Sequence, residues 1–197
     1  MLSGLILAGG SSSRMGRDKA GLVLPDGRTL LQRQGDILRA AGATTLFASV
    51  KRGTEVDLPG VTFVHDRVPD AGPIAGIAAG LRAAPAGLVI VVAVDMPHLS
   101  AEHLRKLVSL ATDTCGVVPV HDGQMEPLAA VYPAALADSA EDALGSERRA
   151  VHAWVTREVK QGRLRLWDTP PGWAGALLSW NTPEDVSASA APGADVT

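Results

Sequence analysis

The chain has 197 residues, 46% of them hydrophobic, which favours one sizeable core over two ordinary domains. Its formal net charge of −3 excludes a global attraction to nucleic acid or to anionic membranes, so an anion site needs a local concentration of positive charge. The longest apolar run, at 87–94, falls far short of the roughly 20 residues of a membrane helix, and the single cysteine, Cys115, excludes an internal disulfide.

Strand and helix patterns alternate from the N-terminus. A short apolar strand at 4–8 runs into glycines, and Thr29 is placed to cap a helix that Gly42 ends. Gly72-Pro73 opens a helix to about residue 84, whose small residues permit close packing on the sheet or against a base. The strand at 87–94 is apolar on both faces, as central parallel strands are.

The alternation continues through the rest of the chain. Further strands are expected near 44–50, 61–65, 116–120, 128–132 and 163–167, and further helices near 100–111, 134–144 and 147–159. His121-Asp122-Gly123 predicts a turn between two of these strands, and Cys115 is expected to be a small core residue. The pattern predicts an α/β fold with three layers (α/β/α) and a Rossmann-like, mostly parallel sheet. We expect one domain over 1–186 and a disordered tail over 187–197, which has too little apolar surface to order itself.

A glycine-rich, basic loop follows the first strand. Three glycines between residues 9 and 16 allow the backbone to approach a ligand closely, while Arg14, Arg17 and Lys19 set three positive charges against one carboxylate. Backbone N–H groups and cations both stabilise a polyphosphate, so this composition favours a phosphate ligand. The spacing is neither a Walker A motif nor G-x-G-x-x-G, and a surface loop without a ligand is the alternative.

Two carboxylates follow predicted strands. Asp95, in Asp95-Met96-Pro97, comes directly after the most apolar strand, and Asp66 follows the strand near 61–65. Ligands of open α/β sheets bind outside the carboxyl ends of the strands, where a carboxylate suits Mg²⁺ shared with phosphate oxygens. The alternatives are a helix-leading turn at Asp95 and a loop cap at Asp66.

Six motifs in order give the chain a family resemblance. They are Leu7-Ala8-Gly9-Gly10 with Arg14-Met15-Gly16 and Asp18-Lys19, then Gly72-Pro73-Ile74-Ala75-Gly76, Asp95-Met96-Pro97, Glu126-Pro127-Leu128, Glu147-Arg148-Arg149 and Asn181-Thr182-Pro183-Glu184-Asp185. Over residues 4 to 186 the chain resembles the molybdenum cofactor nucleotidyltransferases. Within them, Gly-Gly after Leu-Ala and the ending Asn-Thr-Pro-Glu-Asp resemble the guanylyltransferases, since the cytidylyltransferases tend to have Ala-Gly at the first motif.

The resemblance implies a role for each matching position. The loop residues that would meet the guanine nucleotide are Leu7, Ala8, Gly9 and Gly10. Lys19 would bind its phosphates, Asp66 the nucleoside region, and Asp95 both the nucleotide and Mg²⁺. Arg14 would be an additional phosphate clamp, and Arg14, Lys19 and Asp95 together would be the catalytic residues.

Glu126-Pro127-Leu128 and Arg148-Arg149 resemble parts of the family's substrate side, and Asn181 is a candidate for the pterin site. Arg148 and Asn181 would contact molybdopterin, with a solvated helix face and an N-cap as the respective alternatives. The chain departs from the family at Ser49-Val50-Lys51, where an Asn is common.

The activity that the resemblance implies is transfer of GMP from GTP to the phosphate of molybdopterin, with Mg²⁺ as cofactor. Pyrophosphate would be released and molybdopterin guanine dinucleotide formed. Transfer of CMP, transfer to a sugar phosphate and a non-catalytic nucleotide-binding module are the alternatives. The expected partners are GTP, molybdopterin, and cofactor-delivery and molybdoenzyme proteins, but no nucleic acid or membrane. Because the first ten residues lack a basic region and a long apolar run, we expect a cytoplasmic protein.

Overall fold

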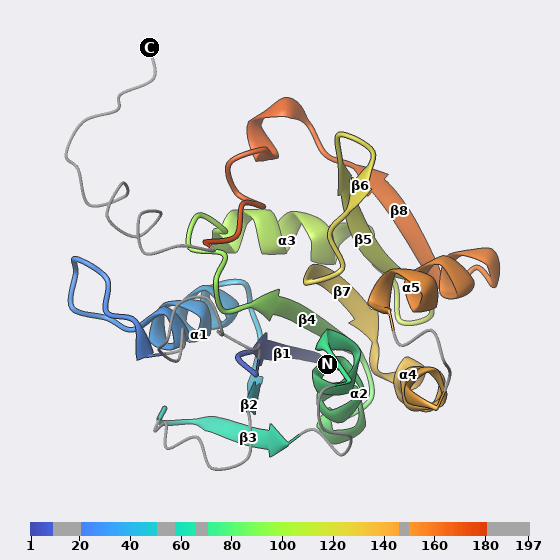
Figure 1. Ribbon diagram of the computed structural model, residues 1–197, viewed down its shortest axis with the longest axis horizontal. Coiled ribbons are helices and arrows are strands. Elements are labelled where there is room, and N and C mark those ends of the chain that lie inside the picture. Colours follow the sequence, from blue (N-terminus) through green and yellow to red (C-terminus); the bar gives the residue numbers. More distant parts are fainter. Residues whose placement is uncertain (10–20, 51–57, 66–70, 146–149, 181–197) are drawn as a thin grey trace.

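The computed structural model describes residues 1–9, 21–50, 58–65, 71–145 and 150–180, and Figure 1 shows how its elements are arranged. A sheet of eight strands runs through the described part in the order β3-β2-β1-β4-β7-β5-β6, with β8 paired to β5. The strands are β1 (Leu2–Leu7), β2 (Thr45–Val50), β3 (Val61–His65), β4 (Leu88–Ala93), β5 (Gly116–His121), β6 (Gln124–Met125), β7 (Ala129–Pro133) and β8 (Leu164–Asp168). The helices are α1 (Leu30–Ala40), α2 (Pro73–Ala83), α3 (Ala101–Leu110), α4 (Ala137–Leu144) and α5 (Val151–Lys160), with 3₁₀ turns η2 (Ala134–Leu136) and η3 (Pro171–Trp173).

The sheet is mostly parallel, with an antiparallel strand inserted in its middle. β1 pairs in parallel with β2 and β4, β2 with β3, and β5 with β8. β7 lies between β4 and β5 and is antiparallel to both, and the short β6 is antiparallel to β5. Because β7 runs against its neighbours, it begins at the sheet edge where β4 and β5 end.

Helices cover both faces of the sheet. Side chains alternate between the faces along each strand, so Ile90 and Val92 of β4 join the apolar cluster beneath α1 and α3, while Val89 and Val91 join the one beneath α2, α4 and α5. Figure 1 shows these two groups of helices on opposite sides of the strands. The predicted three-layer α/β/α fold with a mostly parallel sheet is confirmed.

Two helices begin at capping boxes. The Thr29 hydroxyl accepts a hydrogen bond from the Gln32 N–H (3.1 Å), and the Gln32 side chain accepts one from the Thr29 N–H (2.8 Å). Ser100 and His103 form the same reciprocal pair at the start of α3. The predicted stop of α1 is also confirmed, since Gly42 has a φ of 102°, which favours glycine.

Several boundaries differ from the sequence prediction. Residues 134–136 form a 3₁₀ turn before α4, and α5 begins at Val151 instead of 147, after an extended Ala150. Cys115 is half-buried, not a core residue, because it lies in a bridge with Thr112 just before β5. The tail at 187–197 lies outside the described residues.

The predicted turn after β5 is confirmed, although the strand that follows it was missed. Asp122 (φ 49°) and Gly123 (φ 74°) connect β5 to the two-residue strand β6. Two successive positive φ values are the signature of a type I′ hairpin turn, for which Asp-Gly is a favoured sequence.

The described residues contain no helix that is long and apolar enough to cross a membrane.

Candidate active site

The carboxyl ends of four parallel strands meet at one edge of the sheet. Leu7 at the end of β1 pairs with Ala93 at the end of β4 and with Ser49 near the end of β2. In turn, Val50 at the end of β2 pairs with His65 at the end of β3. The segments that follow these four strands therefore leave the sheet side by side.

The strand order reverses between β1 and β4. The chain leaves β1 through α1 and reaches β2 on one side, whereas it leaves β4 through α3 and reaches β5 on the other side. In open α/β sheets, ligands bind outside the carboxyl ends of the strands at such a switch point. The observed topology therefore points to the ends of β1 and β4 as the ligand site.

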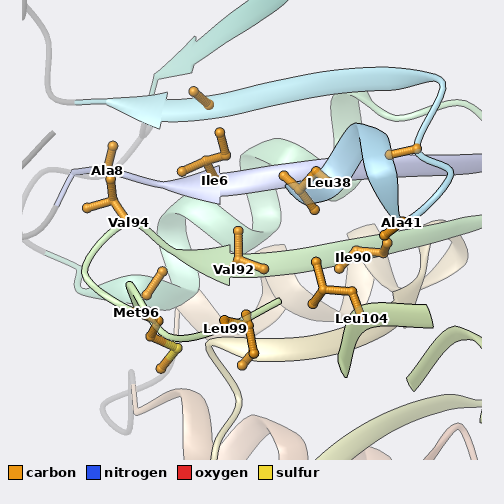
Figure 2. Close-up of a cluster of buried hydrophobic side chains, with 14 of the residues drawn as sticks. Ile6, Ala8, Leu38, Ala41, Ile90, Val92, Val94, Met96, Leu99 and Leu104 are labelled. Carbon is orange, nitrogen blue, oxygen red and sulfur yellow. The ribbon is translucent and has the colours of Figure 1, made fainter. Parts of the chain in front are cut away.

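Asp95 lies at this switch point, where the sequence analysis predicted it. Its neighbours Val94 (5% exposed) and Met96 (1%) are buried, while Asp95 is half-buried. Figure 2 shows Val94 and Met96 in the apolar cluster, with Val94 beside Ala8 at the end of β1. The flanking side chains thus anchor the turn in the core, and the carboxylate sits between two anchored residues.

Backbone hydrogen bonds connect the turn at Asp95 to two distant segments. The Val94 N–H donates to the Leu7 carbonyl (3.1 Å), and the Asp95 carbonyl accepts from the Trp180 N–H (2.8 Å). The Ala8 N–H donates to the Ser49 carbonyl (2.8 Å), so the end of β1 is fixed from both neighbouring strands. The structure therefore brings together Asp95, the first residues of the glycine-rich segment and the residue before Asn181.

Small residues in α2 are explained by packing against the sheet. A Cβ atom at Gly80 would come within 2.3 Å of the Leu5 side chain, and one at Gly76 within 2.7 Å of the Ser49 hydroxyl and 2.9 Å of the Leu7 side chain. Of the two readings that the sequence left open for these glycines, packing on the sheet is the one for which the structure supplies contacts. Ser49 is buried (2% exposed) and faces Gly76.

Comparison with known proteins identifies the family. A family model described as the MobA-like NTP transferase domain matches residues 4–161. A protein of Opitutus terrae named probable molybdenum cofactor guanylyltransferase is 38% identical over 187 residues, which cover 93% of this chain and 92% of that protein. The chain belongs to the MobA-like NTP transferase family.

Solved structures share the fold of this transferase. Molybdopterin-guanine dinucleotide biosynthesis protein A from Archaeoglobus fulgidus superposes with a TM-score of 0.72 at 24% identity, covering 96% of each chain. A Mycobacterium tuberculosis protein solved in complex with manganese superposes with a TM-score of 0.61 at 18% identity, covering 85% of this chain and 87% of that one. The fold of the MobA-like NTP transferase is thus found in both of these proteins, one of which was solved with manganese.

Several predicted site residues of this transferase lie outside the described residues: Gly10, Arg14, Lys19, Asp66, Arg148 and Asn181. Three of them directly follow residues that the structure places at the carboxyl edge, namely Gly9, His65 and Trp180. Their assignments stay predictions. Of the described site residues, Ala8 is buried, and Leu7, Gly9 and Asp95 are half-buried.

A second carboxylate, Glu126, lies at this edge; the family motif placed it only on the substrate side. Glu126 precedes β7, which begins where β4 ends, and the Leu128 N–H donates to its carboxylate (3.2 Å). Burial raises the pKa of Glu126, the Leu128 hydrogen bond and the charge of His152 lower it, and the negative charge of Asp95 raises it further. Placing Glu126 at this edge requires knowing that β7 is antiparallel to β4 and so begins where β4 ends. The sequence pattern does not reveal this pairing.

The carboxylates among the described residues suit a cation that is also bound by phosphate oxygens, and they do not surround a metal ion completely. No group of three His, Cys, Asp or Glu side chains within the described ranges could hold a metal ion. Mg²⁺ and Mn²⁺ are typically bound through one or two carboxylates, with phosphate and water oxygens completing the shell. Asp95, at the end of β4, therefore fits a divalent cation that a bound nucleotide helps to hold.

The aromatic residues near the C-terminal segment belong to the core. Trp180 (6% exposed) packs edge-on against His98 (6.0 Å between ring centroids), and Trp173 (7%) packs in the same way against His103 (4.6 Å). These contacts fix the segment that supplies the Trp180 N–H to Asp95, and they leave these two indole rings little free surface for stacking on a ligand.

Proposed function

We propose that the chain transfers GMP from GTP to the phosphate of molybdopterin, releasing pyrophosphate and forming molybdopterin guanine dinucleotide. The observation that carries the proposal is the position of Asp95 at the switch point between β1 and β4, in a chain that is 38% identical to a protein named molybdenum cofactor guanylyltransferase over nearly its whole length. The similarity to that protein supports guanine as the base. The sheet topology supports the carboxyl ends of β1 and β4 as the location of the reaction.

The reaction needs positioning and charge stabilisation more than proton transfer. A terminal phosphate oxygen of molybdopterin attacks the α-phosphorus of GTP, a new P–O bond forms, and the bond between the α-phosphorus and the bridging oxygen of pyrophosphate breaks. A phosphate monoester is largely ionised near neutral pH, so the protein does not have to remove a proton from the attacking oxygen. The residues must instead hold the two substrates in line.

We assign these tasks to the residues predicted from the family motifs. Asp95 holds a divalent cation, which we take to be Mg²⁺, against the phosphates, and a bound cation at this place stabilises the charge that develops on the phosphoryl oxygens. Lys19 and Arg14 bind the phosphates of GTP. The nucleoside is bound by the loop residues Leu7 to Gly10 together with Asp66.

Molybdopterin is assigned to the side of the site at Arg148 and Asn181. Asn181 directly follows Trp180, whose N–H is bonded to Asp95, so the peptide that leads into Asn181 starts at the proposed metal site. We place the reaction in the cytoplasm, with cofactor-delivery and molybdoenzyme proteins as partners that supply molybdopterin and receive the product.

Nucleotide-dependent stability tests the guanine assignment. Of two ligands that bind only the folded state, the tighter one raises the melting temperature more at equal concentration, so GTP with Mg²⁺ is expected to raise it more than CTP or ATP. Equal shifts for the three nucleotides would contradict guanine specificity. A larger shift with CTP would favour the cytidylyltransferase activity.

A further inference from the structure

A buried polar side chain on α1 faces the segment that carries Asp95. Gln34 has 0% exposure, and it lies one helical turn from both Leu30 and Leu38, which are also fully buried. An amide buried among apolar side chains is unfavourable unless it is hydrogen-bonded. The presence of Gln at this position therefore has to be explained by its contacts.

The Gln34 amide nitrogen donates to the backbone on both sides of Asp95. Nε2 lies 2.9 Å from the Met96 carbonyl oxygen, 3.2 Å from that of Ala93 and 3.4 Å from that of Val94. Turning the amide over would place Oε1 against three carbonyl oxygens, so these neighbours assign the nitrogen to this side. The two hydrogens of Nε2 are therefore shared among three acceptors.

The remaining carbonyl of the segment is bonded from another direction. The Asp95 carbonyl accepts from the Trp180 N–H (2.8 Å). Each backbone carbonyl from residue 93 to residue 96 thus accepts a hydrogen bond from α1 or from the C-terminal segment. Buried carbonyls that lose such a donor keep the full cost of desolvation, so the turn depends on Gln34 for its present backbone conformation.

The other end of the amide shows that the donor is the useful part of this side chain. Among the described residues, Gln34 Oε1 has no hydrogen-bond partner, which is unfavourable for a buried oxygen. An aliphatic residue would avoid that cost and complete the apolar stripe of α1. It would, however, remove the Gln34 donor from the Ala93 and Val94 carbonyls and leave the Met96 carbonyl with only the longer bond from the Leu99 N–H (3.4 Å).

We propose that Gln34 is a positioning residue, whose amide fixes the backbone around Asp95 and so holds the carboxylate in place to bind the divalent cation. This inference rests on the proposed function in one respect, the metal role of Asp95. Residues that orient a metal-binding side chain typically change metal affinity or activity by about 10- to 100-fold when they are replaced.

The test is Gln34→Met, which keeps the length and volume of the side chain and removes the donor. Binding of Mn²⁺ in the presence of GTP is measured by electron paramagnetic resonance, without molybdopterin, so that no turnover is needed. We expect the Mn²⁺ affinity to fall about tenfold, while the affinity for GTP measured without metal stays within about twofold. The matched control is Leu38→Val, which removes a methylene one turn away on the same stripe of α1 and does not touch the turn at Asp95.

The comparison separates positioning from stability. If Gln34→Met and Leu38→Val lower Mn²⁺ affinity equally, or if neither lowers it, Gln34 has no positioning role. Should Gln34→Met fail to fold, Gln34→Asn keeps the amide but shortens its reach, and unchanged Mn²⁺ affinity in that variant would also overturn the proposal. If Mn²⁺ binding depends on Gln34 but a separate assay with GTP and molybdopterin releases no pyrophosphate, the positioning role is supported and the proposed function alone is contradicted.

Discussion

At the scale of single residues, Asp95 distinguishes a catalyst from a nucleotide-binding module. Asp95→Asn preserves size and the local hydrogen bonds of a turn residue but removes the negative charge. If the carboxylate holds a divalent cation against the phosphates, turnover at limiting Mg²⁺ is expected to fall by about 10²-fold. Pyrophosphate release over a series of Mg²⁺ concentrations checks this, with melting curves to confirm that the variant is folded. Unchanged turnover at limiting Mg²⁺ would remove the metal role from Asp95.

Glu126 gives a second prediction at the residue scale, on stability as a function of pH. Burial first of all raises the pKa of Glu126 above its ordinary value of 4.5, so the folded state prefers the neutral carboxyl. The neutral Glu126 therefore contributes to stability fully below pH 4.5, and this contribution is lost as pH rises through the folded pKa of Glu126. Glu126→Gln keeps an oxygen to accept the Leu128 N–H and removes the charge.

The expected result is a variant that is more stable than the wild type at pH 7.5, with a difference that shrinks towards pH 4. Urea unfolding with a chelator present measures this difference, because a bound cation would change the charge balance at Asp95. A difference that stays constant across the pH range would show that the charge of Glu126 is not the cause.

At the scale of elements, α2 depends on two glycines for its contact with the sheet. Replacing Gly80 by Ala places a methyl group within 2.3 Å of Leu5, and such overpacking costs about 1–3 kcal/mol. The gain in helix stability from Gly to Ala is only about 0.5–1 kcal/mol. Gly80→Ala is therefore expected to be destabilising.

The matched control for this prediction is Gly35→Ala in the middle of α1. Its new methyl group would meet the nearest side-chain atoms at 3.4 Å, an ordinary contact distance, so this variant is expected to be neutral or slightly more stable. Urea unfolding of both variants measures the difference. Equal effects at the two glycines would mean that helix propensity, and not packing on the sheet, decides the outcome.

The start of α3 gives an element-scale prediction about pH. His103 Nδ1 accepts from the Ser100 N–H (3.2 Å), which requires an unprotonated Nδ1, and burial lowers the pKa of His103 below 6.5. The stability that this pair contributes is fully present above pH 6.5 and is lost as pH falls through the folded pKa of His103. His103→Gln retains a capping box and cannot titrate, so its unfolding free energy should fall less between pH 7.5 and pH 5 than that of the wild type. An identical fall in both proteins would contradict this account of the cap.

The elements themselves could be predicted because they depend on local patterns. Thr29 and Gly42 marked both ends of α1, and the doubly apolar run at 87–94 marked β4 as a central strand. The order of the strands could not be predicted, because pairing is decided between segments far apart in sequence. The antiparallel β7 between β4 and β5 is the main example.

The same division applies to the site. Asp95 was predicted because it follows a strongly apolar strand, and parallel strands present their carboxyl ends at one edge. Gln34 received no role and Glu126 only a place on the substrate side. Helix packing brings Gln34 to the backbone beside Asp95, and strand pairing brings Glu126 near Asp95, neither of which the sequence pattern reveals. The signal available in the sequence was a Gln at helical spacing between Leu30 and Leu38, but periodicity alone does not separate a buried Gln from one at the edge of the apolar stripe.

At the scale of the whole molecule, the central claim is that a site at the β1–β4 switch point transfers GMP to molybdopterin. The most direct measurement incubates the full chain with molybdopterin, Mg²⁺ and either GTP, CTP or ATP, and follows both pyrophosphate and the mass of the pterin product. We predict pyrophosphate release with GTP far above that with CTP or ATP, a product heavier by one GMP unit, and loss of both signals in Asp95→Asn. Equal release from the three nucleotides, or a product carrying CMP, would contradict the claim.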